Sequence, residues 1–469
     1  MTKDKFLEIC HYLKHILDGS DFVSHTYVVG GAVRDFVMGN EIKDIDLVVS
    51  LPSGGINLAN WLYDNDFLIY KPVLYPTYGT SMFQLKEFPD IELEAVQTRK
   101  EQYKDKNSRN PETAYGTIQE DAMRRDLTIN ALYYSIDTAK IVDVTGKGLN
   151  DIENHIIRVT SDPDIVYQDD ALRILRCIRF ASRFGWRNVE DTTYFGMIRN
   201  VNRLEIITKE RVKDELNKML LVKKPSIALS MIRAIGAMDY VIPALGFTYY
   251  IKQNKYHDYN TVWDHTMMVL DNSLPKLELR MAALLHDIGK IRTKTVDEDG
   301  KVHFYRHELE SSEMCDTILR ELKYSNDFIR KVQIMVRNHM RTKQFGDDLS
   351  SMKTKTLLKL EYELGKDNFN DCLDLIDADN LSHGKEYCMP NQVKHIREKV
   401  NELEKQGISM FDYHLPINGN DVMETLGIPP SSEVKDCLKW AMKFAYNNPN
   451  ITREKLLKQI KQFNNGRYN

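Results

Sequence analysis

Residues 27–50 read YVVGGAVRDFVMGNEIKDIDLVVS, and they combine a Gly-Gly pair with an Asp-x-Asp pair. Residues i and i+2 of a strand point to the same face, so KDIDLVV puts Asp44 and Asp46 side by side while Ile45 and Leu47 face a core. Adjacent carboxylates repel each other unless a cation lies between them, and hard oxygen ligands of this kind suit Mg²⁺. The pattern therefore predicts a metal site, with a solvent-facing acidic strand as the alternative.

The Gly-Gly pair, Gly30 and Gly31, stands between a strand-like run and the start of a helical one. Glycine lets a backbone approach a phosphate closely, and a helix N-terminus offers free N–H groups to an anion. The segment has neither the GK[ST] ending of a P-loop nor the GxGxxG spacing of a dinucleotide site. A phosphate-binding turn is one interpretation, and a plain strand-to-helix turn is the other.

A second acidic strand is predicted where IELEAVQTR repeats the same alternation at residues 91–99. It offers Glu92 and Glu94. Either one would supply a third carboxylate to a two-metal site that clamps an in-line displacement.

The bulk composition is that of a globular protein. The chain has 469 residues, 42% of them hydrophobic, which predicts roughly two to four domains. No apolar run is long enough for a bilayer, and the N-terminal stretch lacks the apolar core of a signal peptide. Six scattered cysteines without a CxxC pair argue against a disulfide framework and a thiolate zinc site. We therefore expect a cytoplasmic protein with no membrane partner; the sequence makes no prediction of oligomeric state.

The chain changes character near residue 150. Strand-like runs (TYVVGG, IDLVVS, IELEAV, TAKIVDV) alternate with helical ones over residues 26–145, and helical periodicity dominates afterwards. The net charge of −4 hides a basic block at residues 171–224, where 13 Lys/Arg stand against six Asp/Glu. Such a block is either a surface for a polyanion or a solvated helix face.

Five motifs in order resemble the class II tRNA nucleotidyltransferases, which comprise the CCA-adding enzymes and their bacterial poly(A) polymerase relatives. The motifs are GGAVRD at 30–35, DID at 44–46, RRDLTINAL at 124–132, DDALRILRCIRFAS at 169–182 and KERVKDELNKML at 209–220. The resemblance covers about residues 26–225. Leu127 and Asp169 stand where the family usually has Phe and Glu.

The resemblance implies a role for each motif. Two Mg²⁺ ions would be held by Asp44 and Asp46, with Glu94 the third carboxylate. The triphosphate would lie on Gly30, Gly31, Arg34 and Asp35, and the ribose of the incoming nucleotide on Arg124, Arg125 and Asp126. The basic block becomes a track for the tRNA acceptor stem, with Lys209, Arg211 and Lys213 as contacts, and it should weaken with salt. A loop at residues 100–115 would take part in the switch from C to A.

The nucleotide choice is argued from base edges. Asp170 and Arg173 are three residues apart on a predicted helix, so they share a face. Cytosine and adenine both present an amino donor beside a ring-nitrogen acceptor, which suits a carboxylate and a guanidinium. Guanine and uracil present the reverse pattern and would leave buried groups unpaired. Arg176 and Arg179 continue the same stripe and either shape this pocket or meet the tRNA.

A second constellation lies downstream in TVWDHTMMVL, AALLHDIGK and LIDADNLSH. It resembles the HD superfamily of metal-dependent phosphohydrolases. The resemblance implies metal ligation by His265, His286, Asp287 and Asp379, while His307 and His339 match extra histidines that hold a second metal or a phosphate. Lys290 lies close enough in sequence to help bind phosphate. Imidazole with carboxylate suits a divalent transition metal or Mg²⁺.

The expected fold class is multidomain α+β. A polymerase β-like nucleotidyltransferase head with a mixed sheet is expected at residues 1–150 and a helical neck and body at 151–245. A helical HD domain is expected at 246–400 and a helical tail at 401–469. The expected function is addition of C, C and A to the 3′ acceptor end of tRNA from CTP and ATP, with phosphohydrolase activity in RNA-end repair. The alternatives are a poly(A) polymerase or partial CC- or A-adding enzyme, and an HD phosphohydrolase with a non-catalytic RNA-binding head. A pure interaction protein would leave both metal constellations unexplained.

Overall fold

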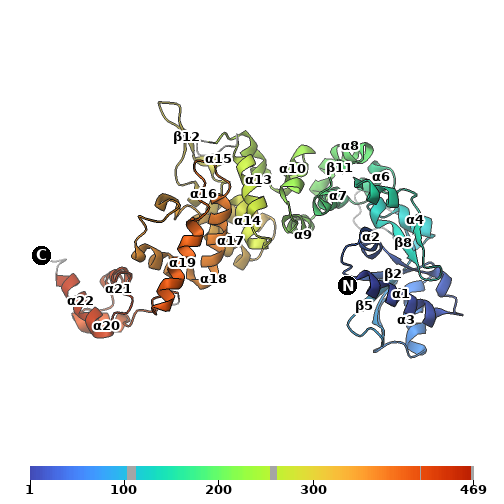
Figure 1. Cartoon of the computed structure of the whole chain (residues 1–469), viewed down its shortest axis with the longest axis horizontal. Coiled ribbons are helices and arrows are strands. Elements are labelled where there is room, and N and C mark those ends of the chain that lie inside the picture. Colours follow the sequence, from blue (N-terminus) through green and yellow to red (C-terminus); the bar gives the residue numbers. More distant parts are fainter. Residues whose placement is uncertain (103–111, 254–260, 412, 466–469) are drawn as a thin grey trace. The chain divides into compact units, whose positions relative to one another are not determined.

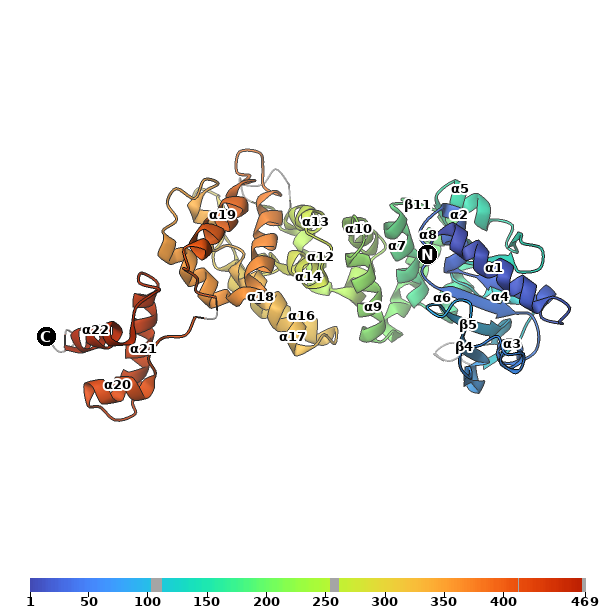
Figure 2. The ribbon, with the colours of Figure 1, turned by 60° about the horizontal axis from the view of Figure 1, so that its bottom comes forward.

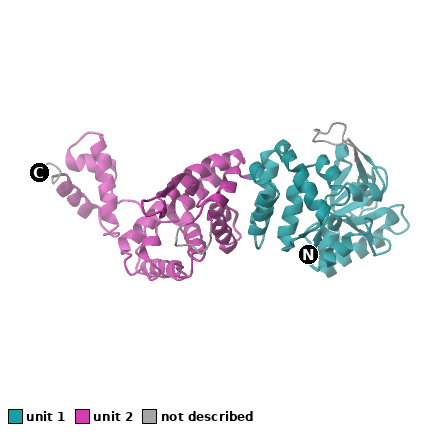
Figure 3. Cartoon of the chain, turned by 90° about the horizontal axis from the view of Figure 1, so that it is seen from above, with its two compact units in different colours: residues 1–241 teal, residues 242–469 magenta. Residues whose placement is uncertain are grey.

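The structure is a computed structural model that describes residues 1–102, 112–253, 261–411 and 413–465. The chain divides into two compact units, residues 1–241 and 242–469 (Figure 3). Within the described residues, no helix combines the length and the apolar character needed to cross a bilayer. Each unit is described by itself below.

The first unit contains a seven-stranded mixed sheet, ordered β3-β4-β5-β2-β1-β8-β9 (Figure 1). Its central pair β2–β5 is parallel, and the other pairs are antiparallel. The strands are β1 (Thr26–Val29), β2 (Ile45–Val49), β3 (Val73–Tyr75), β4 (Thr80–Gln84), β5 (Glu92–Gln97), β8 (Leu132–Ser135) and β9 (Ile141–Asp143). The mixed sheet and helical remainder confirm the expected fold class.

The pleat of β2 produces the predicted alternation, because Ile45 and Leu47 are buried while Asp44 and Asp46 are exposed. The helices around this sheet are α1 (Lys3–Leu17), α2 (Gly31–Met38), α3 (Gly54–Asp64), α4 (Ile118–Met123) and α5 (Gly148–Glu153). Gly30, at φ 74°, makes the turn from β1 into α2. Side chains rarely adopt that conformation, so glycine is favoured there.

The predicted loop at residues 100–115 is partly wrong. Strand β6 (Arg99–Gln102) pairs antiparallel with β7 (Glu112–Tyr115), so both ends of this segment form a hairpin. Residues 103–111, on which the rest of that prediction falls, lie outside the described residues.

The remainder of the first unit is mostly helical. It comprises α6 (Pro163–Asp169), α7 (Leu172–Phe184), α8 (Asp191–Asn200), α9 (Lys209–Leu220), α10 (Ser226–Ala234), α11 (Met238–Val241) and the short strands β10 (Ile156–Ile157) and β11 (Asn188–Val189). Helices α9 and α10 both pack against α7 (Figure 2). Asp170 and Arg173 were predicted to lie on one helix, and that is wrong. Asp170 is extended (φ −149°, ψ 105°) and separates α6 from α7.

The second unit is a helical body with one hairpin. Helices α13 (Val262–Asn272), α14 (Leu277–Leu285), α16 (His307–Glu321), α17 (Asn326–Asn338) and α18 (Thr354–Asn380) pack together. Its other elements are α12 (Pro243–Phe247), α15 (Lys290–Thr293), α19 (Gln392–Lys405) and the strands β12 (Lys294–Val296) and β13 (Val302–Phe304). Helices α20 (Gly419–Leu426), α21 (Ser432–Ala445) and α22 (Arg453–Asn465) share an apolar core of their own.

Candidate functional site

A cavity of about 350 Å³ in the first unit brings together residues from four of the quoted motifs. The Gly-Gly turn, the Asp-x-Asp pair, the RRD motif and α7 all contribute to its wall. The predicted residues that line it are Gly30, Gly31, Arg34, Asp35, Asp44, Asp46, Arg125, Asp126 and Arg176. Residues so distant in sequence therefore surround one volume large enough for a nucleotide.

The acidic side of this site lies on the paired strands β2 and β5. Asp46 is the register partner of Glu94, and Glu92 lies two residues earlier on the same face. Asp44 and Asp46 line the cavity. Partial desolvation raises the pKa of Asp46, and the negative charges of Glu94 and Asp44 raise it further. A carboxylate whose charge is disfavoured by its neighbours is a group that gains from a bound cation.

Arg34 and Asp35 form a buried pair beside the glycine turn. Arg34 donates from Nε and Nη2 to the two carboxylate oxygens of Asp35, at 2.9 and 2.7 Å, and from Nη1 to Asn130 Oδ1 at 2.7 Å. Arg183 Nη2 donates to Asp35 Oδ2 at 3.2 Å. The guanidinium of Arg34 also lies 5.1 Å from the centre of the Phe180 ring. This network fixes one cationic wall before any ligand is bound.

The two arginines of the RRD motif, Arg124 and Arg125, occupy different places in the site. Arg125 lines the cavity, while Arg124 donates to the carbonyl of Arg99 at the base of the β6–β7 hairpin. Both bind the buried carboxylate of Asp121, whose Oδ2 also accepts from Tyr133 Oη at 2.7 Å. Burial alone would raise the pKa of Asp121, but Arg125 and Arg124 lower it to about 2. The ionised carboxylate thus holds Arg125 in place.

Asp126 is buried and joins the head to α7. Its Oδ2 accepts from Arg176 Nε at 2.7 Å, and its Oδ1 accepts from Asn130 Nδ2 at 3.0 Å. Asn130 therefore bridges Arg34 and Asp126. Burial disfavours ionisation, but Arg176 and Asn130 outweigh it and lower the pKa of Asp126.

The two residues of the predicted base-selecting pair, Asp170 and Arg173, bind different partners in this structure. Asp170 Oδ2 accepts from Arg211 Nη2 at 2.7 Å, whereas Arg173 Nη1 points to the carbonyl of Val166 at 3.4 Å. Neither Asp170 nor Arg173 is among the residues that line the cavity. Because the helix is broken at Asp170, the three-residue spacing does not put the two side chains on one face.

The other predicted basic residues of this region lie away from the cavity wall. Arg179 is buried and pairs with Glu215 on α9, at the centre of the α7–α9 contact. Lys209 donates from Nζ to the carbonyl of Tyr240 at 2.9 Å, and Lys213 is half-buried.

Sequence reasoning missed three residues that build the first site. Asn130 lies inside the quoted RRDLTINAL motif, and Asp121 precedes the two arginines by a helical turn, so both had a local signal. Arg183 is seven residues after Arg176 and continues its stripe on α7. Their importance is visible only in the pairing described above.

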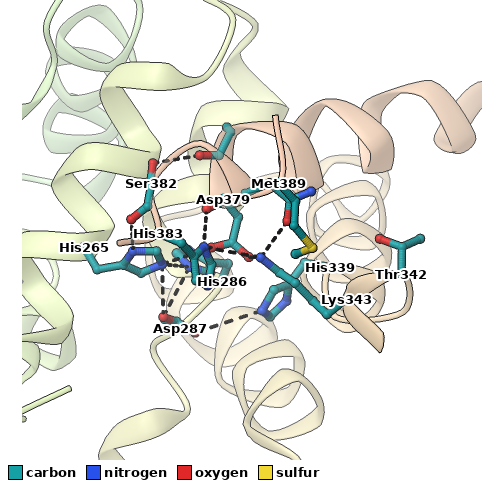
Figure 4. Close-up of polar contacts among 12 residues, drawn as sticks. His265, His286, Asp287, His339, Thr342, Lys343, Asp379, Ser382, His383 and Met389 are labelled. Atoms are coloured by element: carbon teal, nitrogen blue, oxygen red, sulfur yellow. Dashed lines mark hydrogen bonds and ion pairs between the residues drawn. The ribbon is translucent and has the colours of Figure 1, made fainter. Parts of the chain in front are cut away.

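A second cavity, of about 510 Å³, lies within the second unit, and His265, Asp287, His307, His339 and Asp379 are among the residues that line it. Figure 4 shows the polar contacts of the HD constellation. The two oxygens of Asp287 face different pairs of histidines. Oδ2 lies 3.3 Å from His286 Nε2 and 3.7 Å from His265 Nε2, and Oδ1 lies 3.2 Å from His307 Nε2 and 4.0 Å from His339 Nε2. Potential ligand atoms within 4.8 Å of one another thus form two groups that share Asp287.

The histidine tautomers are set by backbone carbonyls. Nδ1 of each faces a carbonyl oxygen at 2.7–3.2 Å: Ser382 for His265, Ala283 for His286, Phe304 for His307 and Val336 for His339. A carbonyl only accepts, so Nδ1 carries the proton and Nε2 of a neutral ring presents a lone pair inward. The Nε2 atoms of His265 and His286 are 3.3 Å apart, and those of His307 and His339 are 3.4 Å apart. Buried lone pairs that face each other this closely fit a metal cation between them.

Asp379 completes the cavity on the side of α18. Its Oδ1 lies 3.0 Å from His265 Nε2, and its Oδ2 binds Lys343 Nζ at 2.9 Å. Lys290 Nζ similarly holds Asp287 Oδ2 at 2.7 Å. Burial, followed by the neighbouring histidines, lowers the pKa of His339 to about 3, so its ring is neutral as a metal ligand requires.

Lys343 and His383 also line this cavity and were missed from the sequence. His383 had a signal, since it follows Asp379 by four residues, just after the end of α18. Lys343 had none, because its neighbourhood carries no recognisable motif.

Three protein-family models match parts of this chain. Residues 26–158 match the poly A polymerase head domain, residues 188–247 the probable RNA and SrmB-binding site of polymerase A, and residues 261–384 the HD domain.

This chain is similar to several known proteins in sequence and to several solved structures in fold. A multifunctional CCA protein of Janthinobacterium sp. (strain Marseille) is 32% identical, with 67% of this chain and 72% of the relative covered. That of Methylobacillus flagellatus is 30% identical, with 75% and 83% covered. Among solved structures, the fold resembles the Bacillus stearothermophilus CCA-adding enzyme in complex with CTP (TM-score 0.68, 19% identity, 99% and 98% covered). It also resembles the Thermotoga maritima CCA-adding enzyme complexed with tRNA (TM-score 0.60, 19% identity, 98% and 95% covered). With two assembled sites and relatives of this identity and coverage, the chain belongs to the multifunctional CCA protein family.

Proposed function

We propose that the chain adds C, C and A to the 3′ end of tRNA from CTP and ATP. The observation that carries this proposal is the cavity where the Gly-Gly turn, Asp44 and Asp46, and four arginines converge. Nucleotidyl transfer depends on positioning and charge stabilisation, and such a wall supplies an anion-binding turn, metal-ligand carboxylates and fixed cations.

Each wall of the cavity has its own task in this proposal. Asp44 and Asp46, with Glu94 alongside, hold two Mg²⁺ ions. When bound, Mg²⁺ lowers the pKa of the RNA 3′-hydroxyl and neutralises the triphosphate and the departing pyrophosphate. Gly30 and Gly31 seat the triphosphate at the start of α2, and the clamped Arg125 contributes a fixed positive charge beside it.

Base selection requires a rearrangement at α9 in this proposal. Asp170 and Arg173 read the amino group and ring nitrogen shared by cytosine and adenine. Asp170 is occupied by Arg211 in the structure, so the incoming base must displace that guanidinium. Asp126, already paired with Arg176, lies next to the ribose.

The test uses tRNA transcripts that end at the discriminator base, at C and at CC. Each is incubated with labelled CTP and ATP, and the products are sized on a sequencing gel. Completion to CCA and no further supports the proposal. Addition that stops at CC, or only A added to CC, would assign a partial enzyme, and long A tails on any RNA would assign a poly(A) polymerase.

A second activity, divalent-metal phosphohydrolysis, is supported by the Asp287-centred cluster. In this proposal His265 and His286 would hold one divalent metal, His307 and His339 would hold a second, and Asp287 would be shared by the two groups. The metals would supply the activation of water as a nucleophile at neutral pH, and the cationic Lys343 and Lys290 favour a phosphate beside the cluster. RNA ends that carry a 2′,3′-cyclic phosphate or a 2′-phosphate are the substrates proposed.

Measuring the metal content of variants distinguishes the shared role of Asp287 from the roles of the two histidine pairs. Elemental analysis of purified variants should find both metals lost from Asp287→Asn and one lost from His339→Ala. His395→Ala, outside the cavity, should retain both and serve as the control. Full metal content in Asp287→Asn would overturn the bridging role, and hydrolysis of a 2′,3′-cyclic phosphate by the metal-free variant would overturn the metal mechanism.

A further inference from the structure

Lys343 in the HD cavity is held by one carboxylate of the cavity wall and by one amide that is buried outside it. Its Nζ binds Asp379 Oδ2 at 2.9 Å (Figure 4) and donates to Asn380 Oδ1 at 2.8 Å. Asp379 lines the cavity, whereas Asn380 is not among the lining residues and is fully buried. The other oxygen of Asp379, Oδ1, lies 3.0 Å from His265 Nε2. The position of the lysine therefore decides how much of this carboxylate is left for a metal.

Asn380 is in turn fixed by Gln392, at the start of α19. Asn380 Nδ2 donates to Gln392 Oε1 at 3.1 Å, and Thr342 Oγ1 donates to the same oxygen at 2.8 Å. Gln392 Nε2 donates to the carbonyls of Thr342 and Gly346, at 3.1 and 2.7 Å. The side chains of Thr342, Asn380 and Gln392 are all fully buried. The two amides thus form a buried chain of hydrogen bonds that ends at Lys343.

The direction of this chain is set by the backbone. A carbonyl oxygen only accepts, so the two carbonyls identify the group of Gln392 that faces them as its NH₂. Its Oε1 then faces the NH₂ of Asn380, which leaves Asn380 Oδ1 for Lys343. Reversing either amide would put two acceptors or two donors together, and unpaired buried polar groups are costly. One orientation of both amides satisfies every partner, and it places an acceptor at the ammonium of Lys343.

The start of α19 is also attached to the short segment that carries Lys343, residues 342–347. Asp347 Oδ1 accepts from the backbone N–H groups of Asn391 and Gln392, at 2.7 and 3.0 Å. Its Oδ2 accepts from Asn391 Nδ2 at 2.9 Å. Because both ends of this segment are bound to α19, the backbone of Lys343 is fixed together with its ammonium.

We propose that Asn380 and Gln392 are positioning residues of the HD site, which act through Lys343 and touch neither metal nor phosphate. This role rests on the proposed phosphohydrolase function, in which Lys343 favours a phosphate beside the Asp287-centred cluster. A long, flexible lysine side chain loses conformational entropy when it is held in one position. Here that entropy is lost on folding rather than on phosphate binding, which strengthens binding. Lys343 also occupies Oδ2 of Asp379, so this carboxylate has only Oδ1 left for a metal.

The test is a double-mutant cycle on the binding of inorganic phosphate, measured by titration calorimetry with the full chain loaded with Mn²⁺. The variants are Lys343→Met, Asn380→Ala and the two combined. Asn368→Ala is the matched control, because Asn368 Nδ2 donates only to the carbonyl of Leu364 among its described hydrogen bonds and lies on the same helix, α18. Phosphate bound at the head contributes equally to all of these proteins and cancels in the comparison.

Lys343→Met should weaken phosphate binding about tenfold and Asn380→Ala about fivefold, because one removes the cation and the other releases it. The double variant should bind like Lys343→Met alone, since Asn380 then has no lysine to position. Effects that multiply in the double variant, or wild-type binding by Asn380→Ala, would overturn the positioning role. An unchanged dissociation constant in Lys343→Met would instead overturn the place of phosphate in the proposed phosphohydrolase.

A measurement without metal or phosphate covers the case in which Asn380→Ala folds poorly. Gln392→Glu replaces the NH₂ that faces two carbonyls by an oxygen, so the amide chain breaks at nearly constant side-chain volume. Acetylation of the metal-free full chain, followed by mass spectrometry, should modify Lys343 at least about threefold faster in Gln392→Glu than in wild type, as expected for the loss of one net hydrogen bond. The exposed Lys359 is the internal reference. Equal rates at Lys343 in the two proteins would refute the amide chain.

Discussion

The head site and the HD site both contain carboxylates, but these differ in burial and in ion pairing. In the head, Asp44, Asp46 and Glu94 lie exposed on one sheet face without an ion pair among the contacts described for them. In the HD cavity, Asp287 and Asp379 are buried and already hold lysines at 2.7 and 2.9 Å. The carboxylates of the head cavity are thus solvent-exposed, whereas those of the HD cavity are buried and paired.

The difference teaches how burial dictates organisation. A buried carboxylate is costly unless it is paired, so the HD cluster must be arranged by the fold itself. An exposed carboxylate is solvated by water, so it needs no ion pair in the absence of a metal. The predictions below separate the two sites on this basis.

Removing both head carboxylates should have the largest effect. Asp44→Ala with Asp46→Ala is expected to lower nucleotide addition by at least about 10³-fold, because the carboxylates proposed to hold Mg²⁺ are lost. Hydrolysis of a 2′,3′-cyclic phosphate should be unchanged, as the HD site is intact. Labelled CTP incorporation and phosphate release measure the two activities in one preparation. Glu92→Ala is the control on the same acidic face, and addition surviving in the double variant would refute the assignment.

Breaking the buried HD cluster should affect folding as well as chemistry. Asp287→Asn leaves Lys290, a buried cation, without its carboxylate, and we expect a loss of about 3 kcal/mol in the free energy of unfolding. Urea denaturation with chelator present measures this loss. Nucleotide addition should stay within about twofold at a temperature where the variant is folded. Asp297→Asn, at an exposed position, is the control, and equal stability of the two variants would contradict the description of Asp287 as buried and paired.

Asp121 is a buried and paired carboxylate in the head, so its ionisation should make stability depend on pH. Its folded pKa of about 2, below the ordinary 3.8, means that ionised Asp121 stabilises the fold above pH 3.8. This stabilisation, about 2 kcal/mol, is lost as the pH falls from 3.8 toward 2. Asp121→Asn should therefore be less stable than wild type at pH 7, with the gap narrowing below pH 4. A gap independent of pH would show that the carboxylate's charge is not what holds Arg124 and Arg125.

The basic residues of α9 should divide into two groups. Lys209→Ala is expected to raise the KM for tRNA about threefold and leave that for ATP unchanged, with a shallower salt dependence. Arg211→Ala frees Asp170 and should change the KM values for CTP and ATP as well. Steady-state kinetics at two salt concentrations measure both. Equal effects of Lys209→Ala on tRNA and ATP would count against the acceptor-stem track.

The smallest effect is expected on stability, for substitution of the exposed Asp46, which is proposed to hold Mg²⁺. The pKa of Asp46 is raised above 3.8, so its ionised form destabilises the metal-free fold, and this penalty is present at neutral pH. Asp46→Asn with chelator should be slightly more stable than wild type at pH 7, by less than about 1 kcal/mol. The gain should vanish as the pH falls below 3.8, which thermal melts across pH can follow. A less stable Asp46→Asn would mean that the acidic face is not under repulsion.

The parts predicted from sequence were those with a local pattern. Alternating burial placed Asp44 and Asp46 on one face, and β1, β2, β5 and β9 were predicted as strands. Strand β8, with all four residues buried, has no alternation that distinguishes it from a helix, and β3 is only three residues long. The site residue roles, the boundaries of the four predicted regions and the identity of the metals stay predictions.

The sequence by itself determined the family and the mixed-sheet head with its helical remainder, because motif order and strand periodicity are local properties of the chain. It also predicted the residues that carry metal chemistry. Only the tertiary structure decided which charges meet. Arg34 binds Asn130 across 96 residues, and Asp126 binds Arg176 across 50. In the tertiary structure Asp170 is extended between two helices, and its carboxylate accepts a hydrogen bond from Arg211. Such pairs depend on burial and on the packing of distant elements, which no local spacing encodes.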